Sequence, residues 1–156
     1  MEFRLAVESD LDAILELYKS NILANKDYNQ EQKEVWASSV NNREMWLNKI
    51  KEQYFLLAYK NNKILGFCSL GQRDYVEMMF VQKDEFGKGV ASGLLQNIET
   101  VAKSNQITQL LADVSLSGRR FFEKRGFRVL RTNRNFRNGI YLKNYRMRKL
   151  LKETID

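Results

Sequence analysis

The sequence predicts an α/β fold in which a mixed sheet carries helices on its faces. Three observations lead to this prediction. Apolar residues recur at helical spacing in the first third of the chain, they follow strand patterns through the middle, and a glycine-containing turn then leads from a strand into an amphipathic helix. The length of 156 residues, with 44% hydrophobic and 29% charged residues, is typical of a single globular domain over residues 1–156.

The first third of the chain is expected to hold one strand and two or three helices. Phe3–Val7 alternates as a strand does, and Ser9 or Asp10 can cap a helix that runs to Ala24. Residues 30–51 have the apolar spacing of one or two further helices, interrupted by a Ser-Ser pair and an Asn-Asn pair.

Strand patterns dominate the remainder of the chain. Strands are expected at residues 54–59, 64–70, 75–81, 109–114, 127–131 and 140–147, and helices at residues 89–104 and 118–124. The turn Lys60–Lys63 makes the first two strands a hairpin, and Gly126 ends the second of these helices. A connecting segment over residues 133–139 is expected to join the last two strands. The expected order is therefore β-α-α-β-β-β-α-β-α-β-β.

The most informative feature is the turn Gly87-Lys88-Gly89, between a strand that ends at Val81 and the helix that follows. Free backbone N–H groups and the positive end of a helix dipole favour an anion there, and glycine lets a bulky anion approach the backbone. The alternative is a loop that only needs positive φ angles, since a Gly-x-Gly pair is common. Ser92 breaks the dinucleotide pattern, and the P-loop signature is absent.

The composition excludes several chemistries. The chain has no histidine, which excludes Ser-His-Asp and Cys-His sites, and its single cysteine cannot supply a Cys/His zinc site, so no metal is expected. Any proton transfer must use Glu, Asp, Tyr, Lys, Cys or water. Cys68 has no partner for an internal disulfide, which fits a reducing compartment, so a cytoplasmic location is expected. No apolar run approaches the roughly 20 residues that a membrane span needs.

The glycine turn resembles the pyrophosphate loop of the GCN5-related N-acetyltransferase (GNAT) family, whose pattern is [QR]-x-x-G-x-[GA]. The segment Phe86–Ala91 fits this pattern except at its first position, where Phe86 stands in place of Gln or Arg. Two other segments resemble the family: the opening F-R-L-A-V-E-S-D-L-D-A-I-L-E-L, and F-F-E-K-R-G-F at residues 121–127, where the family has F-Y-E-K-x-G-F. Residues 28–36 and 139–147 are similar to a small bacterial branch, the YafP-like proteins.

The resemblance implies a mostly antiparallel sheet with helices on both faces and acetyl-CoA in a cleft between two splayed parallel strands. It implies that the pantetheine arm of acetyl-CoA pairs with the backbone of the strand before the glycine turn. The residues implied to contact acetyl-CoA are Met79, Phe80 and Val81 on that strand, Gly87, Lys88, Gly89, Val90, Ala91 and Ser92 at the pyrophosphate, Ser115 on the cofactor arm, and Phe122 at the leaving thiolate. Ser115 stands where the family often has Asn.

Phe122 is the most consequential departure, because the family's tyrosine at this position commonly protonates the leaving thiolate. Either the thiolate leaves unassisted, or another hydroxyl serves, and the candidates are Ser117, Tyr141 and Tyr145. Glu77 is the leading candidate for the base. Strand alternation places its side chain on the same face as that of Met79, beside a largely apolar cleft.

Each remaining candidate also has a purely structural interpretation. Asp113 is the second candidate for the base, although it also fits a turn or helix-capping role, and Glu77 fits an exposed strand position. Tyr28 and Trp36 are candidates for an acceptor pocket, although aromatic residues at such positions also serve as packing. No sequence feature separates these interpretations.

The leading functional hypothesis is transfer of an acetyl group from acetyl-CoA to an amine of an unidentified acceptor. A non-catalytic acyl-CoA-binding module is the alternative, because of Phe122. A nucleic-acid-binding protein is a third, because residues 119–152 hold thirteen Lys or Arg and one acid, Glu123, within a net charge of +7. The same charges also fit a solvated surface. A two-fold dimer is the default oligomeric state.

Overall fold

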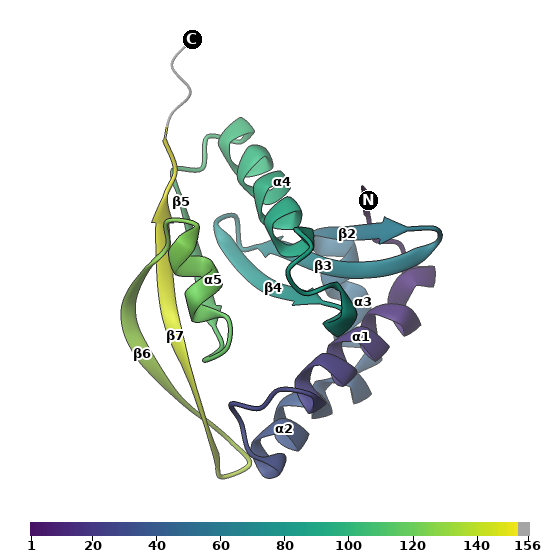
Figure 1. Ribbon diagram of the computed structural model, residues 1–156, viewed down its shortest axis with the longest axis vertical. Helices are drawn as coiled ribbons and strands as arrows, with labels where there is room; N and C mark the ends of the chain where they lie inside the picture. The colour runs from purple at the N-terminus through teal and green to yellow at the C-terminus, as the bar shows by residue number, and fades with distance from the viewer. Residues whose placement is uncertain (153–156) are drawn as a thin grey trace.

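The computed structural model describes residues 1–152, and its seven strands join in one sheet (Figure 1). The strands are β1 (Glu2–Leu5), β2 (Tyr54–Lys60), β3 (Lys63–Gly71), β4 (Tyr75–Val81), β5 (Gln109–Val114), β6 (Arg128–Arg137) and β7 (Ile140–Leu150). They lie in the order β1-β2-β3-β4-β5-β7-β6, and every neighbouring pair is antiparallel except β4 with β5. The predicted mixed, mostly antiparallel sheet is confirmed. Residues 153–156 of the predicted domain lie outside the described residues.

Helices cover both faces of the sheet, as predicted. They are α1 (Leu11–Leu23), α2 (Gln30–Ala37), α3 (Arg43–Glu52), α4 (Val90–Ser104) and α5 (Arg119–Lys124), with a 3-10 turn at Ser38–Asn41 between α2 and α3. The Ser-Ser and Asn-Asn pairs thus separate two helices. Within residues 1–152, no helix is both long and apolar enough to cross a bilayer.

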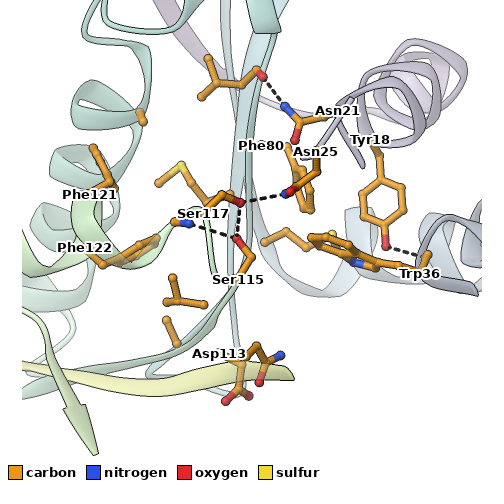
Figure 2. A pocket seen from close by; sticks show the side chains of 18 of the residues that line it. Tyr18, Asn21, Asn25, Trp36, Phe80, Asp113, Ser115, Ser117, Phe121 and Phe122 are labelled. Atoms are coloured by element: carbon orange, nitrogen blue, oxygen red, sulfur yellow. Dashed lines mark hydrogen bonds between the residues drawn. The ribbon is translucent and has the colours of Figure 1, made fainter. Parts of the chain in front are cut away.

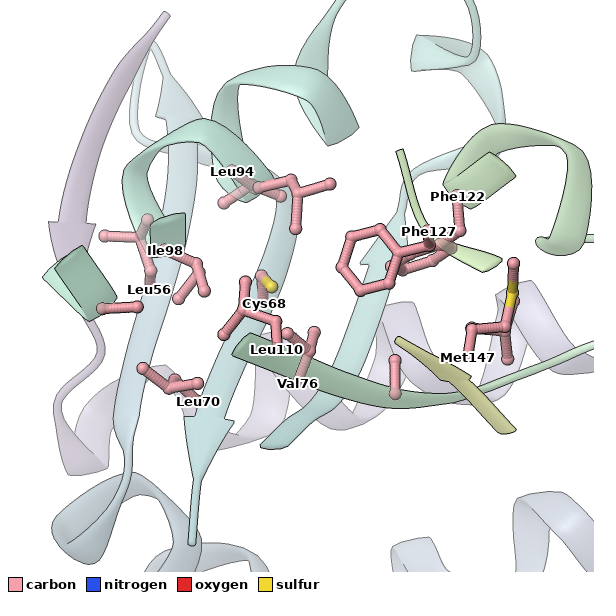
Figure 3. Packing of buried hydrophobic residues seen from close by; sticks show 14 of the residues in the cluster. Leu56, Cys68, Leu70, Val76, Leu94, Ile98, Leu110, Phe122, Phe127 and Met147 are labelled. Carbon is pink, nitrogen blue, oxygen red and sulfur yellow. The ribbon is translucent and has the colours of Figure 1, made fainter. Parts of the chain in front are cut away.

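The two faces hold two apolar clusters. One packs α1 and α3 against β2 and β3, around Trp46 and Phe67, both fully buried. The other packs α4 against the opposite face, where Leu94 and Ile98 lie over Leu56 and Cys68 (Figure 3). Full burial of each such aliphatic side chain contributes about 1.5–3 kcal/mol. This second cluster continues to Phe122, Phe127 and Met147, so it joins α5 and β7 to the rest of the sheet.

Two hairpins close through two-residue turns, one Asn-Asn and the other Asn-Gly. Asn61 and Asn62 have φ angles of 52° and 62°, and Asn138 and Gly139 have φ angles of 50° and 77°. Positive φ at both positions gives a turn whose twist matches that of the strands. The prediction that residues 133–139 only connect the last two strands is therefore wrong, because β6 pairs with β7 as far as Arg137. The Asn-Gly dipeptide was the signal for this turn.

Strands β4 and β5 pair over a single step and then separate. Their parallel register covers only Tyr75 with Leu111 and Val76 with Ala112. On its other edge β4 carries an irregularity at Glu77, because Val76 faces Leu70 and Met78 faces Ser69. A bulge of this kind bends a strand and increases its local twist. It therefore turns the rest of β4 away from β5, and the gap is visible in Figure 1.

The bulge also changes which face each side chain of β4 occupies. Met78 packs with the α1 and α3 cluster, and Met79 packs with the α4 cluster. Glu77 reaches Lys49 and Gln53 at the end of α3, and so lies on the side opposite Met79. The expectation that Glu77 and Met79 share a face is wrong, because strict alternation fails at a bulge.

Candidate active site

A cleft of about 1550 Å³ runs between the separated strands. It is lined by the open side of β4, the end of β5, the start of α4, α5, the α1–α2 connection and the tip of the β6–β7 hairpin. The volume exceeds the roughly 300–1,000 Å³ of a typical small-molecule pocket. The cleft therefore has room for an extended ligand.

The start of α4 forms an anion cradle at one end of the cleft. Gly87 and Gly89 have φ angles of 78° and 84°, and a Cβ added to either would meet no atom within 4 Å. Gly89 caps the helix without any side-chain hydrogen bond. The N–H groups of the first helical turn, Val90 to Ser92, have no intrahelical acceptors. Together with the helix dipole, these N–H groups favour an anion at the place where the sequence predicts a phosphate site.

The predicted loop residues come together at this cradle, with one difference. Gly87, Gly89, Val90, Ala91 and Ser92 all line the cleft. Lys88 is not among the lining residues of the described chain, and its ammonium lies 3.9 Å from the carboxylate of Glu85. Lys88, which the resemblance placed at the pyrophosphate, therefore does not line the cleft.

The open edge of β4 offers backbone hydrogen-bonding groups to the cleft. Gln82 donates its N–H to Leu65 on β3, and the groups of an antiparallel strand alternate between its two edges. The backbone groups of Met79 and Val81 therefore point away from β3. The carbonyl of Val81 already accepts a hydrogen bond from Nδ2 of Asn21 on α1, at 2.6 Å (Figure 2). The N–H and C=O of Met79 remain for a ligand.

Phe80 lies on the other face of β4 and belongs to an aromatic wall. Its ring centroid lies 4.8 Å from that of Tyr18 and 6.3 Å from that of Trp36. All three rings line the cleft. Phe80 therefore lies on the α1 and α2 side of the cleft rather than the α4 side.

The end of β5 contributes a short chain of hydroxyl groups opposite β4. Asn25 donates from Nδ2 to Oγ of Ser117 at 2.8 Å, and Ser117 lies 3.3 Å from Oγ of Ser115 (Figure 2). Ser115 also accepts the N–H of Gly118 at 3.2 Å. Both serines line the cleft, so Ser115 is where the sequence placed it, although its hydroxyl also supports the start of α5.

Phe122 forms an apolar part of the cleft wall. Its side chain is 5% exposed and packs edge-to-face against Phe121 and Phe127, with ring centroids at 5.3 and 5.0 Å. Of the hydroxyls proposed to replace the missing tyrosine, Ser117 lines the cleft, whereas Tyr141 and Tyr145 are not among its lining residues in the described chain. The ring of Tyr141 packs on Phe136 instead.

Glu77 lines the cleft with both carboxylate oxygens engaged. Lys49 donates from Nζ to Oε1 at 2.8 Å, and Gln53 donates from Nε2 to Oε2 at 2.7 Å. The Glu77 side chain is 24% exposed. Its surroundings are thus polar, unlike the apolar cleft that the sequence suggested. These two contacts fix the carboxylate in position beside the cleft.

Asp113 is the centre of a hydrogen-bond cluster. It accepts two bonds from Arg146, at 2.8 and 2.9 Å, one from the hydroxyl of Tyr75 and one from Asn133, both at 2.6 Å. Burial alone would raise the pKa of Asp113, but the bonds from Arg146 and Tyr75 outweigh it and hold the pKa below its ordinary value. Burial and Asp113 together raise the pKa of Tyr75. Asp113 therefore ties β4, β5, β6 and β7 together and is a poor base.

Tyr28 and Trp36 have different surroundings. The hydroxyl of Tyr28 donates to the carbonyl of Lys143 at 2.7 Å and accepts the N–H of Leu116 at 3.1 Å. Tyr28 is 7% exposed, and burial raises the pKa of its hydroxyl. It joins the α1–α2 connection to both β7 and the end of β5. Trp36 packs edge-to-face on Tyr28 and presents a partly exposed ring to the cleft.

The cleft residues that the sequence did not predict include three with polar contacts between distant segments. Asn21 and Asn25 lie at the end of α1 and just after it, where the sequence offers no sign that they reach β4 and the β5–α5 turn. Arg125 follows α5, and its guanidinium donates to Oγ of Ser92 at the start of α4. Only the excess of basic residues after Arg119 hinted at this last residue.

The arrangement of the acidic side chains and of the single cysteine bears on metal and thiol chemistry. Within residues 1–152, no group of three or more Cys, Asp or Glu side chains is arranged to hold a metal ion. Cys68 is fully buried, and burial raises the pKa of its thiol. Its thiolate form is therefore disfavoured.

Comparison with known proteins matches this geometry to one family. The Acetyltransferase (GNAT) domain family matches residues 24–149. A protein of Escherichia coli strain K12, the uncharacterized N-acetyltransferase YafP, is 30% identical over 125 residues, which are 80% of this chain and 78% of that protein.

Solved structures agree with this match. A GCN5-related N-acetyltransferase from Rhodopseudomonas palustris is 28% identical with a TM-score of 0.92, over 96% of this chain and 95% of the other. The structure of yncA from Salmonella typhimurium was solved with its cofactor acetyl-CoA. It has a TM-score of 0.74 at 22% identity and covers 100% of this chain and 96% of the other, so it supports the fold. The chain belongs to the GCN5-related N-acetyltransferase family and resembles YafP.

Proposed function

We propose that the protein binds acetyl-CoA in the cleft between β4 and β5 and transfers its acetyl group to an amine. The observation that carries the proposal is the pairing of an anion cradle at the start of α4 with open backbone groups at Met79. The phosphates would lie on the N–H groups of Gly87 to Ser92, and the pantetheine amides would pair with Met79. The yncA protein, which has the same fold, was solved with acetyl-CoA, and this supports acetyl-CoA as the ligand.

The reaction needs a proton acceptor for the ammonium group of the acceptor. The amine nitrogen forms a bond to the acetyl carbon, the carbon–sulfur bond breaks, and the amine loses a proton. Glu77 is the better candidate for this base, because Asp113 accepts four hydrogen bonds and has a lowered pKa. A base can act directly or through one water. Lys49 and Gln53 would hold the Glu77 carboxylate in position.

The thiolate of coenzyme A would leave without a tyrosine at position 122. Phe122 can supply only an apolar wall, and a thiol is acidic enough for its anion to leave unaided. Should a proton donor act, Ser117 is better placed than Tyr141 or Tyr145, because its hydroxyl lines the cleft. The acceptor would enter from the side of Trp36.

Binding and turnover test this proposal separately. Acetyl-CoA at about 100 times its Kd should raise the free energy of unfolding by roughly 2.7 kcal/mol, which a melting curve detects. A panel of amines, with release of free thiol as the signal, would then identify an acceptor. An unchanged melting temperature at millimolar acetyl-CoA would refute the binding site. Binding without turnover on any amine would favour the acyl-CoA-binding module.

A further inference from the structure

Arg125 lies beside the anion cradle without belonging to the glycine turn. It follows the last residue of α5, and Gly126 then ends the helix with a φ angle of 93°. The side chain reaches across to α4, where its Nη2 donates to Oγ of Ser92, and both residues line the cleft. Two elements that are 33 residues apart in the chain thus meet at the start of α4.

The guanidinium is held in position and lacks an acidic partner. It lies over the ring of Phe121, 4.5 Å from the ring centroid, and this contact restricts its orientation. Within residues 1–152, its side-chain contacts are with Ser92 and Phe121, and no carboxylate lies within ion-pair distance of it. Its neighbour Arg119 contrasts with it, because Arg119 pairs with Glu123 at 2.7 Å. Most N–H groups of Arg125 therefore remain available to a ligand.

The other side chains of the cradle do not supply this charge. Phe86 is 61% exposed and has no hydrogen-bond donor on its side chain, and Lys88 does not line the cleft. A phosphate on the N–H groups of the first turn of α4 would lie within reach of a group already bonded to Ser92. Arginine presents a planar fork that matches two phosphate oxygens.

We propose that Arg125 is a phosphate-binding residue that completes the cradle and contacts the pyrophosphate of the bound coenzyme. Ser92 and Phe121 orient the guanidinium for this contact. The proposal rests on the proposed function, since it takes coenzyme A as the ligand of the cleft. It adds a binding residue just after α5 whose side chain reaches the start of α4.

The test measures the Kd of coenzyme A and of 3′-dephospho-coenzyme A for four proteins. These are the parent, Arg125→Gln, Arg125→Lys and the control Arg120→Gln. Arg120 is exposed on the same helix and does not line the cleft, so its loss removes the same charge without removing the contact. We expect Arg125→Gln to raise the Kd of both ligands about tenfold or more, as for a hydrogen bond to a charged group. The Kd values of Arg125→Lys should lie between those of the parent and those of Arg125→Gln, and the Kd values of Arg120→Gln should match those of the parent.

The remaining outcomes each decide a separate point. An Arg125→Gln protein that binds both ligands as the parent does would overturn the proposal. An equal loss in Arg120→Gln would also overturn it, because the effect would then be general charge. A loss confined to coenzyme A would move the contact to the 3′-phosphate and overturn the pyrophosphate assignment. A parent that binds neither ligand would instead refute the proposed function. Melting curves without ligand show whether each variant is folded. If Arg125→Gln does not fold, the Kd values of Arg125→Lys decide the test in its place.

Discussion

Gly89 allows the cradle to be tested apart from the fold, because the chain contains a matched glycine elsewhere. Gly89 and Gly139 have φ angles of 84° and 77°, and an added Cβ would meet no atom within 4 Å at either position. Gly89 caps α4 in the cleft, whereas Gly139 lies in the β6–β7 turn and does not line it. A substitution therefore strains the backbone similarly at both sites but reaches the cradle only at Gly89.

The magnitudes follow from the backbone and from Coulomb's law. A residue other than glycine in the left-handed region costs about 1–2 kcal/mol, so Gly89→Glu and Gly139→Glu should each lower the melting temperature by roughly 2–8 °C. A new carboxylate about 4 Å from a phosphate costs between about 1 and 4 kcal/mol, depending on the effective dielectric. Taking about 2–4 kcal/mol for a doubly charged pyrophosphate, Gly89→Glu should weaken acetyl-CoA binding by roughly 30- to 1,000-fold.

Titration calorimetry with acetyl-CoA at fixed ionic strength supplies the measurement. Gly139→Glu should bind within about threefold of the parent, because its added charge lies far from the cradle and is screened. Gly89→Ala adds backbone strain without charge, so its affinity for acetyl-CoA should fall between those of Gly89→Glu and Gly139→Glu. If Gly89→Glu bound acetyl-CoA about as tightly as Gly139→Glu, the start of α4 would not be the phosphate site.

Three further variants test the chemistry and the support of the site. Glu77→Gln should lower kcat by roughly 100-fold with the Kd of acetyl-CoA nearly unchanged, and full activity at neutral pH would exclude Glu77 as the base. Phe122→Tyr should leave kcat unchanged or slightly lower it, because the added hydroxyl enters a packed wall; a gain of about tenfold would show that protonation of the thiolate limits the rate. Asp113→Asn should destabilise the protein by about 1–3 kcal/mol at neutral pH, because Arg146 loses its charged partner. The folded-state pKa of Asp113 is lowered, so its stabilisation is present above its ordinary pKa and is lost as the pH falls through the folded value. The difference in melting temperature between parent and Asp113→Asn should therefore shrink only below about pH 4, and a constant difference down to pH about 2 would contradict this origin.

Features that depend on residues close in sequence were predictable. The bounds of β4 and β5 agree with the apolar runs at 75–81 and 109–114, because a buried strand needs little more than such a run. The glycine turn and the helix after it were also found, since positive φ and a helix start leave local marks. The β6–β7 hairpin was misjudged because its arginines and asparagines hide the strand pattern, although Asn138-Gly139 marks its turn.

Contacts that cross the cleft were not predictable in the same way. Asn21 reaches the carbonyl of Val81 and Arg125 reaches Ser92 only because the sheet and the two helix layers bring distant segments together. A single sequence contains no pattern for such pairs. The same applies to Tyr28, whose aromatic ring suggested an acceptor pocket but whose hydroxyl joins the α1–α2 connection to β7.

One inserted residue explains several features of the site at once. Because Glu77 has no partner position on β3, β4 bends after Val76, and its pairing with β5 stops there. That bend leaves the backbone of Met79 open to a ligand. It also turns the Glu77 side chain towards Lys49 and Gln53, at the rim of the same cleft. The backbone groups proposed to hold acetyl-CoA and the carboxylate proposed to take the proton therefore depend on the same irregularity. Restoring regular pairing at position 77 should therefore disturb both the proposed binding groups and the proposed base.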